Sequence, residues 1–310
     1  MKILTEEASS IFVTDHVKAK IATGIDYEYG TCTNEFNFFK CEPSALFVLD
    51  PRPSHDCMST IYPPHYEPYN FHKMGKVINF FRSFVQKNKI EHIRQYLSNS
   101  SKILDIGCGN GTLLLLIQKY GDPSWQLYAN ELNQSCVDHL NNNNVTAYSC
   151  DYSALKFEGE IDFIILNQVI EHFDRPDKLL SYCNKFLKPG GHIYIETPST
   201  EGLDAKIFKG GTWGGYHFPR HFYLFSNSNL ELLLQQCQFQ DITCCYLTSP
   251  AFWTQSLHHL MIKIGLKRIS RLMHLKNLPL TAFFTLFDLL IIKIGGKTSN
   301  MRIVAKKHAA

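Results

Sequence analysis

Acidic and glycine residues at the ends of apolar runs are the first candidates for chemistry in this sequence. Residues 103–111 read Ile-Leu-Asp-Ile-Gly-Cys-Gly-Asn-Gly, so Asp105 ends an apolar run and a glycine-rich turn follows it. A carboxylate at a strand end is easily solvated and can meet a positively charged or hydroxylated ligand. The turn contains Gly107, Gly109 and Gly111, and glycines let a backbone pass close under a ligand. This stretch predicts a small-molecule binding turn.

Two further acids follow the next two apolar segments. Glu131 lies 24 residues after Gly107, close to the offset of about 20 residues at which an acid meets a ribose in nucleotide-binding α/β units. The alternative is a solvated acid at the start of a loop. Asp151 precedes Tyr152, so an acid that accepts from an adenine amino group has an aromatic neighbour. The alternative there is an aspartate that only makes a turn.

A fourth polar group follows the apolar segment 161–167. Asn167 and Gln168 are neutral hydrogen-bonding residues, and Glu171 and His172 come shortly after them. His172 is a candidate general base because an imidazole titrates near neutral pH. The alternative, which we weigh equally, is that Glu171 and His172 cap the segment that follows.

The loop 209–225 combines glycines, aromatic residues and basic residues in an unusual density. Its glycines and Pro219 exclude a regular helix or a central strand. Long polar loops at the ligand end of a sheet are commonly functional. His217, Arg220 and His221 are therefore candidates for binding a second small molecule, the substrate, at this edge of the sheet. Arg220 has the geometry to hold a phosphate or carboxylate. The alternative is a packed loop whose histidines bond backbone carbonyls.

These candidates require a parallel sheet whose strands end at one edge. Strand-like and helix-like patterns alternate after residue 101, which indicates such a sheet with helices on both faces. Gly190 and Gly191 are expected to break the chain before the fifth strand, and Ser228 with Glu231 to form a capping box. The predicted strands are 102–106, 126–131, 145–149, 161–167, 191–197, 241–247 and 301–306, and the predicted helices are 76–98, 110–120, 133–142, 175–187 and 226–237.

The pattern Asp-x-Gly-x-Gly-x-Gly at 105–111 resembles the first motif of class I S-adenosylmethionine-dependent methyltransferases. Its spacing differs from the dinucleotide fingerprint Gly-x-Gly-x-x-Gly, which disfavours a dehydrogenase. The resemblance implies an α/β fold with a doubly wound, seven-stranded, mostly parallel sheet, and S-adenosylmethionine as the cofactor. It also implies the residues that contact this cofactor: Asp105, Gly107, Cys108, Gly109, Glu131, Leu132, Asp151, Tyr152, Asn167 and Gln168.

The segments 24–29, 51–53 and 61–66 and the loop 209–225 resemble a bacterial group of these methyltransferases that is associated with glycan and surface-polysaccharide pathways. The resemblance implies methyl transfer to a hydroxyl of a small or glycan- or lipid-linked acceptor. The candidate catalytic residues are His172, His217, His221 and Arg220.

Two alternatives to the glycan acceptor remain open. Glu171-His172 also resembles quinone-type O-methyltransferases, in which a second acid three residues earlier helps to bind a divalent metal. That position is Gln168 here, so no metal is expected, although a neutral oxygen can still ligate a hard cation. The second alternative is a non-catalytic S-adenosylmethionine-binding partner protein.

The chain is expected to consist of a methyltransferase core, 76–250 and 299–310, with two additions. Residues 1–75 are predicted to form an N-terminal lid, a degenerate knuckle-like subdomain with short strands at 11–14 and 44–49 and too few cysteines for a structural zinc. Residues 251–298 are predicted to form a helical insertion before the last strand. Within it, 252–276 mixes basic and apolar positions and 280–294 is strongly apolar, so 252–294 is a candidate for peripheral membrane contact or a homodimer interface.

Composition narrows the class of protein further. A hydrophobic share of 45% and a charged share of 19% are ordinary for a globular enzyme, and a net charge of +3 does not favour nucleic acid. The ten cysteines contain no Cys-x-x-Cys pair and are expected to be reduced thiols. Residues 1–15 carry acids and no long apolar run, so no signal peptide is expected. The predicted location is the cytoplasm, with peripheral contact at the inner face of the membrane as an additional hypothesis.

Overall fold

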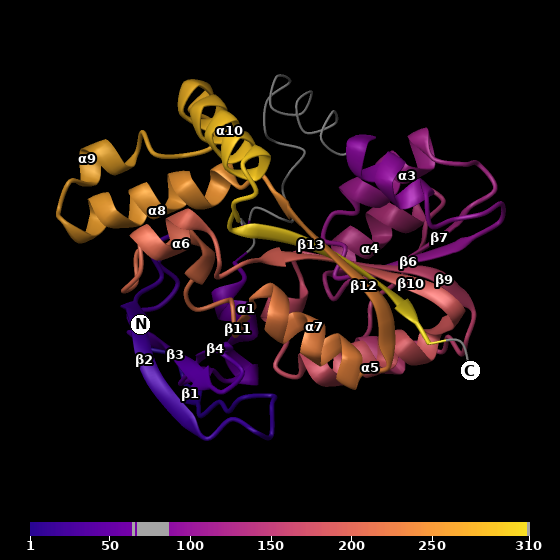
Figure 1. The fold of residues 1–310 in the computed structure, drawn as a ribbon, viewed down its shortest axis with the longest axis horizontal. Coiled ribbons are helices and arrows are strands. Elements are labelled where there is room, and N and C mark those ends of the chain that lie inside the picture. Colours follow the sequence, from indigo (N-terminus) through magenta and orange to yellow (C-terminus); the bar gives the residue numbers. More distant parts are fainter. Residues whose placement is uncertain (64–65, 67–86, 309–310) are drawn as a thin grey trace.

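A seven-stranded sheet forms the centre of the molecule (Figure 1). The computed structural model describes residues 1–63, 66 and 87–308. The strand order is β12-β13-β10-β9-β6-β7-β8, and β13 runs antiparallel to both of its neighbours while the other adjacent pairs are parallel. This arrangement confirms the predicted doubly wound, mostly parallel α/β sheet.

The strands and helices of this layer lie close to their predicted positions. The strands are β6 (Lys102–Ile106), β7 (Gln126–Asn130), β8 (Thr146–Tyr148), β9 (Ile161–Asn167), β10 (Leu187–Pro198), β12 (Phe239–Leu247) and β13 (Asn300–Lys307). The helices are α3 (Thr112–Tyr120), α4 (Gln134–Asn141), α5 (Pro176–Phe186) and α7 (Asn227–Gln236). Of the predicted helix 76–98, residues 87–94 are helical and 76–86 lie outside the described residues.

Both faces of the sheet are covered by apolar helix surfaces. Helices α3 and α4 lie on one face, and α5 and α7 on the other (Figure 1). The α3 face packs Leu114 and Ile117 against strand residues such as Phe163, all at most 1% exposed. The opposite face packs Leu180 of α5 and Leu233 of α7 into a second core. Burial on both faces explains why the central strands are continuous apolar runs.

Two local predictions about this layer are wrong. Strand β10 begins at Leu187 and includes Gly190, because the chain passes the glycines as a bulge between Leu187 and His192 and does not break. The capping box of α7 is formed by Ser226 and Asn229, two residues earlier than expected. Asparagine at the third helical position fulfils the role that the capping rule gives to glutamate or glutamine.

A second, four-stranded sheet lies beside the core. Its order is β11-β4-β3-β2, with β2 (Val17–Gly24), β3 (Phe36–Glu42), β4 (Phe47–Leu49) and β11 (Tyr223–Leu224). Short strands β1 (Thr5–Glu6) and β5 (Arg52–Pro53) pair with each other, and helix α1 (Met58–Ile61) follows. The expected strand at 11–14 is absent, whereas the one at 44–49 is present in part as β4. Because β11 belongs to the loop 209–225, this loop is part of the N-terminal sheet.

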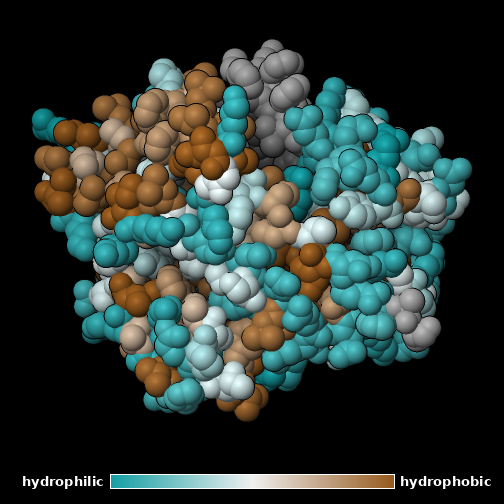
Figure 2. Space-filling view, viewed as in Figure 1, coloured by the Kyte–Doolittle hydropathy of each residue, from teal (hydrophilic) through white to brown (hydrophobic). Residues whose placement is uncertain are grey.

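A helical lobe precedes the last strand. It contains α8 (Pro250–Lys263), α9 (Lys267–Ser270) and α10 (Leu278–Lys293). Helix α8 contacts α6 (Leu203–Ile207), and α10 contacts β12. The mixed basic and apolar segment 252–276 does not form one continuous helix, because Gly265 adopts φ +82° and ends α8. Figure 2 shows a concentration of hydrophobic residues on this lobe. Among the described residues, no helix is both long and apolar enough to cross a bilayer.

Candidate active site

The glycine turn and Glu131 are connected at the carboxyl ends of β6 and β7. Gly107 and Gly111 both have φ +70°, and a Cβ on Gly107 would lie 2.9 Å from the Val169 side chain. The Gly109 N–H donates to Glu131 Oε2 at 2.9 Å, and the Asn133 N–H donates to Oε1 at 3.0 Å. Positions 107 and 111 therefore favour glycine, and two backbone N–H groups hold the Glu131 carboxylate beside the turn.

Asp105 is buried without a full set of hydrogen bonds. It is 2% exposed, and Oδ1 has no hydrogen-bond partner within the described part of the chain. Burial raises the pKa of Asp105 to about 8, although the nearby Lys89 ammonium acts in the opposite direction. A ligand that donates hydrogen bonds or carries positive charge would satisfy this oxygen.

Sequence reasoning missed a buried charge network beside Asp105. Lys89 Nζ donates to Asn167 Oδ1 at 2.9 Å and to Glu196 Oε2 at 2.7 Å. Arg302 Nη2 donates to Glu196 Oε1 at 3.2 Å. Burial opposes ionisation of Glu196, but the charges of Lys89 and Arg302 hold its pKa below the ordinary value. The sequence signal that could have predicted this network is a lysine, Lys89, directly before the apolar Ile90, which is buried. The network also fixes Asn167 at the end of β9.

The other predicted cofactor residues are arranged around the same strand ends. Leu132 is 73% exposed directly after Glu131. Asp151 is exposed and accepts from the Ser153 N–H at 2.9 Å, so it makes the turn that was the alternative interpretation. Tyr152 is 9% exposed and packs edge-on against Phe173, with 5.3 Å between ring centroids. The contact of Asp151 and Tyr152 with adenine stays a prediction.

Gln168 is held in an unusual backbone conformation. Its φ is +56°, its N–H donates to Glu196 O at 2.7 Å, and its side-chain Nε2 donates to Asn300 Oδ1 at 2.9 Å. A non-glycine residue with positive φ is uncommon and is typical of functional turns. Gln168 is thus fixed where β9 meets η5 (Ile170–His172).

The three candidate histidines lie together beyond β9. The ring centroids of His172 and His221 are 4.6 Å apart, and those of His217 and His221 are 4.9 Å apart. His172 Nδ1 lies 3.0 Å from the Tyr62 hydroxyl, a contact that sequence reasoning missed. Burial, reinforced by the charge of His217, lowers the pKa of His172 to about 3. Helix α5 begins without a side-chain cap, so the alternative capping role is not observed.

His217 forms an ion-pair contact with Glu28 of the N-terminal segment. His217 Nδ1 and Glu28 Oε1 are 2.7 Å apart. Burial opposes ionisation of Glu28, but the charge and hydrogen bond of His217 hold its pKa below the ordinary value. Glu28 also accepts from Gln255 Nε2 of α8 at 3.3 Å, and it lies 3.7 Å from His259 Nε2. Since the carboxylate can only accept, Nδ1 carries the hydrogen and Nε2 is the basic nitrogen of a neutral His217.

Arg220 is engaged inside the protein. Its Nη1 and Nη2 donate to the two carboxylate oxygens of Asp26 at 3.1 and 3.0 Å, and its Nε donates to Ile61 O at 2.7 Å. The guanidinium also lies 4.4 Å from the Tyr29 ring centroid. Burial opposes ionisation of Asp26, but Arg220 lowers its pKa to about 2. We infer that Arg220 holds the loop against the N-terminal segment and positions the histidines.

Replacing Asp26 with asparagine is expected to reduce the free energy of unfolding by about 3 to 5 kcal/mol, because it leaves the fully buried Arg220 without its carboxylate. Guanidinium chloride unfolding measures this loss. The control is Glu160→Gln, which removes the partner of Lys102 in a more exposed ion pair, where about 0 to 1 kcal/mol is expected. Equal effects of the two substitutions would contradict the assigned role.

Comparison with known proteins gives the class of this site. A family model described as a methyltransferase domain matches residues 72–243, which is more than half of the 310 residues. The chain is 25% identical over 154 residues to the mitochondrial ubiquinone biosynthesis O-methyltransferase of Dictyostelium discoideum, covering 44% of this chain and 47% of that protein. A ubiquinone biosynthesis O-methyltransferase of Coxiella burnetii (strain Dugway 5J108-111) is 29% identical over 118 residues, covering 35% and 49%. The chain thus spans about half the length of these curated relatives.

Other relatives act on different acceptors. The malonyl-[acyl-carrier protein] O-methyltransferase of Haemophilus influenzae is 26% identical over 120 residues, covering 37% of this chain and 46% of that protein. In fold, the chain resembles Haemonchus contortus phosphoethanolamine N-methyltransferase 2 in complex with S-adenosyl-L-methionine, with a TM-score of 0.51 and 18% identity over 92% of this chain and 66% of that one. The chain belongs to the methyltransferase domain family, which confirms the expected class and its cofactor, S-adenosylmethionine.

Proposed function

We propose that this protein transfers the methyl group of S-adenosylmethionine to a hydroxyl oxygen of its acceptor. The observation that carries the proposal is the pairing of His217 with Glu28 at 2.7 Å, with the His217 ring 6.2 Å from the ring of His172 in η5, which follows β9. A carboxylate that orients an imidazole makes the opposite ring nitrogen a general base. A hydroxyl acceptor needs such a base, because it must lose its proton as the methyl group arrives.

The residues at the strand ends fit S-adenosylmethionine. Asp105 offers a buried oxygen that lacks a partner among the described residues, and Glu131 is held beside a turn in which Gly107 packs closely against Val169. When bound, this cofactor supplies an electrophilic methyl group on a sulfonium. The protein has to align the acceptor with that methyl group and remove the acceptor proton. Asp105, Glu131 and Asn167 are proposed to bind the cofactor, and His217 to take the proton.

The acceptor we propose is a small or glycan- or lipid-linked molecule. The resemblance of the loop 209–225 to methyltransferases of polysaccharide pathways supports this class. A quinone-like phenol is the second candidate, and it is favoured by the similarity of this chain to ubiquinone biosynthesis O-methyltransferases. An acceptor panel that contains nucleotide sugars, glycan ends and catechols, read out as S-adenosylhomocysteine formed, separates the two. If no acceptor in the panel yields S-adenosylhomocysteine although the cofactor binds tightly, the result favours a non-catalytic S-adenosylmethionine-binding partner protein.

Replacing Glu131 with alanine is expected to weaken S-adenosylmethionine binding about 10- to 100-fold, because charge-assisted hydrogen bonds to ribose hydroxyls contribute about 1.5 to 3 kcal/mol. Calorimetry measures both affinities. The control is Glu158→Ala on the surface, which removes a glutamate whose side chain is 75% exposed and pairs with Lys185. Unchanged affinity in Glu131→Ala would refute the proposed ribose contact.

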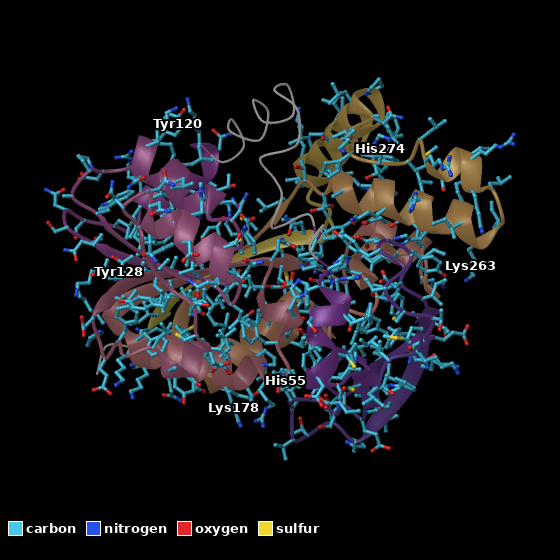
Figure 3. The ribbon with its side chains drawn as sticks, turned by 180° about the vertical axis from the view of Figure 1, so that it is seen from behind. His55, Tyr120, Tyr128, Lys178, Lys263 and His274 are labelled. Carbon is cyan, nitrogen blue, oxygen red and sulfur yellow. The ribbon has the colours of Figure 1, made fainter. Side chains whose placement is uncertain are left out.

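We also propose that the helical lobe docks on an anionic membrane, which suits a lipid-linked acceptor. Helix α10 exposes Phe283, Leu286 and Leu290, which are 60%, 67% and 56% exposed. The same lobe carries basic residues in and around α9: Lys263, Lys267, Arg268 and Arg271. Figure 2 shows the apolar surface, and Lys263 is labelled on the same lobe in Figure 3. Exposed apolar side chains together with basic side chains on one surface are typical of peripheral membrane helices.

The protein is expected to sediment with phosphatidylserine-containing vesicles at low salt and to remain in solution with vesicles of phosphatidylcholine alone. The triple variant Phe283→Ser, Leu286→Ser and Leu290→Ser should no longer sediment with the phosphatidylserine-containing vesicles. Leu232→Ser, at a 40% exposed leucine of α7, is the matched control. Absence of binding to anionic vesicles at low salt would rule out this docking surface.

A further inference from the structure

Glu171, His172 and His221 lie close together in the site. The proposed role of His217 as the base does not account for this cluster. The ligand-type atoms of its three side chains lie within 4.8 Å of one another. Glu171 is fully buried, and its Oε2 accepts from the Thr197 hydroxyl at 2.8 Å. Its Oε1 has no hydrogen-bond partner in the part of the chain that the structure describes. A buried carboxylate oxygen without a partner is costly, and a cation or hydrogen-bond donor bound at this oxygen would remove that cost.

His172 and His221 each place their Nε2 atom toward Glu171 Oε1. His221 Nδ1 lies 2.8 Å from Gly215 O, and His172 Nδ1 lies 3.1 Å from Arg220 O. A carbonyl oxygen can only accept, so Nδ1 of His221 carries the hydrogen and its Nε2 offers a lone pair. His172 Nδ1 also lies 3.0 Å from the Tyr62 hydroxyl, and His172 has the same tautomer when its Nδ1–H donates to Arg220 O and the hydroxyl oxygen accepts. Both Nε2 atoms are 4.0 Å from Glu171 Oε1. That separation is too long for a hydrogen bond, so a shared proton does not link these atoms.

We propose that Glu171, His172 and His221 bind one divalent transition-metal ion of the zinc class. Two neutral imidazoles and one carboxylate are a frequent ligand set for such ions, whereas Mg²⁺ and Ca²⁺ prefer oxygen ligands throughout. A backbone carbonyl holds the Nδ1–H of each imidazole, which is the usual outer support of a metal-binding histidine. Bonds of about 2 Å would require the three atoms to approach one another more closely than the 4.0 Å that separates each Nε2 from Glu171 Oε1. The His172 side chain is 18% exposed, which leaves access from solvent.

This ligand set differs from the one expected by analogy with quinone-type enzymes. There a second acid precedes the Glu-His pair by three residues, and the corresponding Gln168 uses its side-chain amide to bond Asn300 at 2.9 Å. The loop 209–225 supplies His221 in its place. The site is thus assembled from the end of β9 and a loop that is distant in sequence, which is why the Glu-His motif alone did not predict it.

Metal binding is tested on the full chain after treatment with a chelator, without cofactor or acceptor. Calorimetry with Zn²⁺ is expected to show one ion per chain, and Co²⁺ should give visible absorption bands of a site with nitrogen and oxygen ligands. Glu171→Gln and His221→Asn should each weaken Zn²⁺ binding at least tenfold. Asparagine can keep the donor to Gly215 O while it removes Nε2. His274→Asn, at an exposed histidine labelled in Figure 3, is the control.

The outcomes separate this site from the proposed transfer. Wild-type protein that binds no Zn²⁺, or binding that is unchanged in both Glu171→Gln and His221→Asn, overturns the metal site. Neither result bears on cofactor binding or methyl transfer, because the titration contains neither ligand. Circular dichroism verifies the fold of each variant. Since Glu171 and His221 are varied separately, misfolding of one variant leaves the other to decide.

Discussion

Replacing His217 with asparagine is expected to lower kcat by about 10²- to 10⁴-fold, the usual contribution of a positioned general base. Affinity for S-adenosylmethionine should stay unchanged, because His217 lies with Glu28 in the loop and N-terminal segment and not at the glycine turn. The measurement is steady-state formation of S-adenosylhomocysteine with an accepted hydroxyl substrate, together with calorimetric binding of the cofactor. Full turnover in the variant would refute the assignment of His217 as the base.

Asparagine is the appropriate replacement because of the backbone at this position. His217 has φ 38° and ψ 48°, a left-handed conformation that asparagine tolerates better than most residues. Its side-chain amide can still donate to Glu28, so the loop keeps this contact. His274→Asn serves as the control for loss of an exposed histidine. A companion variant, Glu28→Gln, tests the positioning role: it should lower kcat less and shift the pH profile of kcat, whereas a merely structural role would leave that profile unchanged.

The parts of the fold that were predicted correctly depend on local patterns. Strand β6, the glycine turn and α3 follow one another within residues 102–120, and the apolar run, the turn glycines and the helical spacing are all visible there. The strands of the N-terminal sheet carry weaker signals. Strand β3 alternates buried Phe36 and Phe38 with polar Asn37, but Lys40 and Cys41 disturb the pattern.

The acceptor side depends on contacts between distant segments. Glu28 and His217 are 189 residues apart, and Asp26 and Arg220 are 194 residues apart. A single sequence carries no signal for such pairs. Their residue type alone made His172, His217 and His221 candidates. The hydrogen-bond partners of their rings, however, are set by the fold. For the same reason Arg220, which has the chemistry of an anion-binding residue, is found in a buried pair with Asp26.

The second large effect is expected at Asp105. Burial raises its pKa to about 8, so near pH 7 the free protein holds this carboxyl mainly in the protonated form. The amino group and hydroxyls of the cofactor favour the carboxylate, so binding should lower the pKa and release a proton. Affinity is therefore expected to rise with pH up to about 8, by at most about tenfold per pH unit, and then to level off. Calorimetry in buffers of different ionisation enthalpy measures the proton directly.

Asp105→Asn separates this explanation from a general pH effect on the protein. An amide cannot ionise, so the variant should bind S-adenosylmethionine more weakly, without the Asp105 proton release and its share of the pH dependence. Its stability should also change with a definite sign. The unfolded chain ionises Asp105 near 3.8, whereas the folded protein keeps the proton up to about 8. Each pH unit between these values therefore costs the wild type up to about 1.4 kcal/mol of unfolding free energy. Guanidinium chloride unfolding should show the variant gaining on the wild type from pH 5 to pH 8, and parallel curves would contradict the buried, protonated state of Asp105.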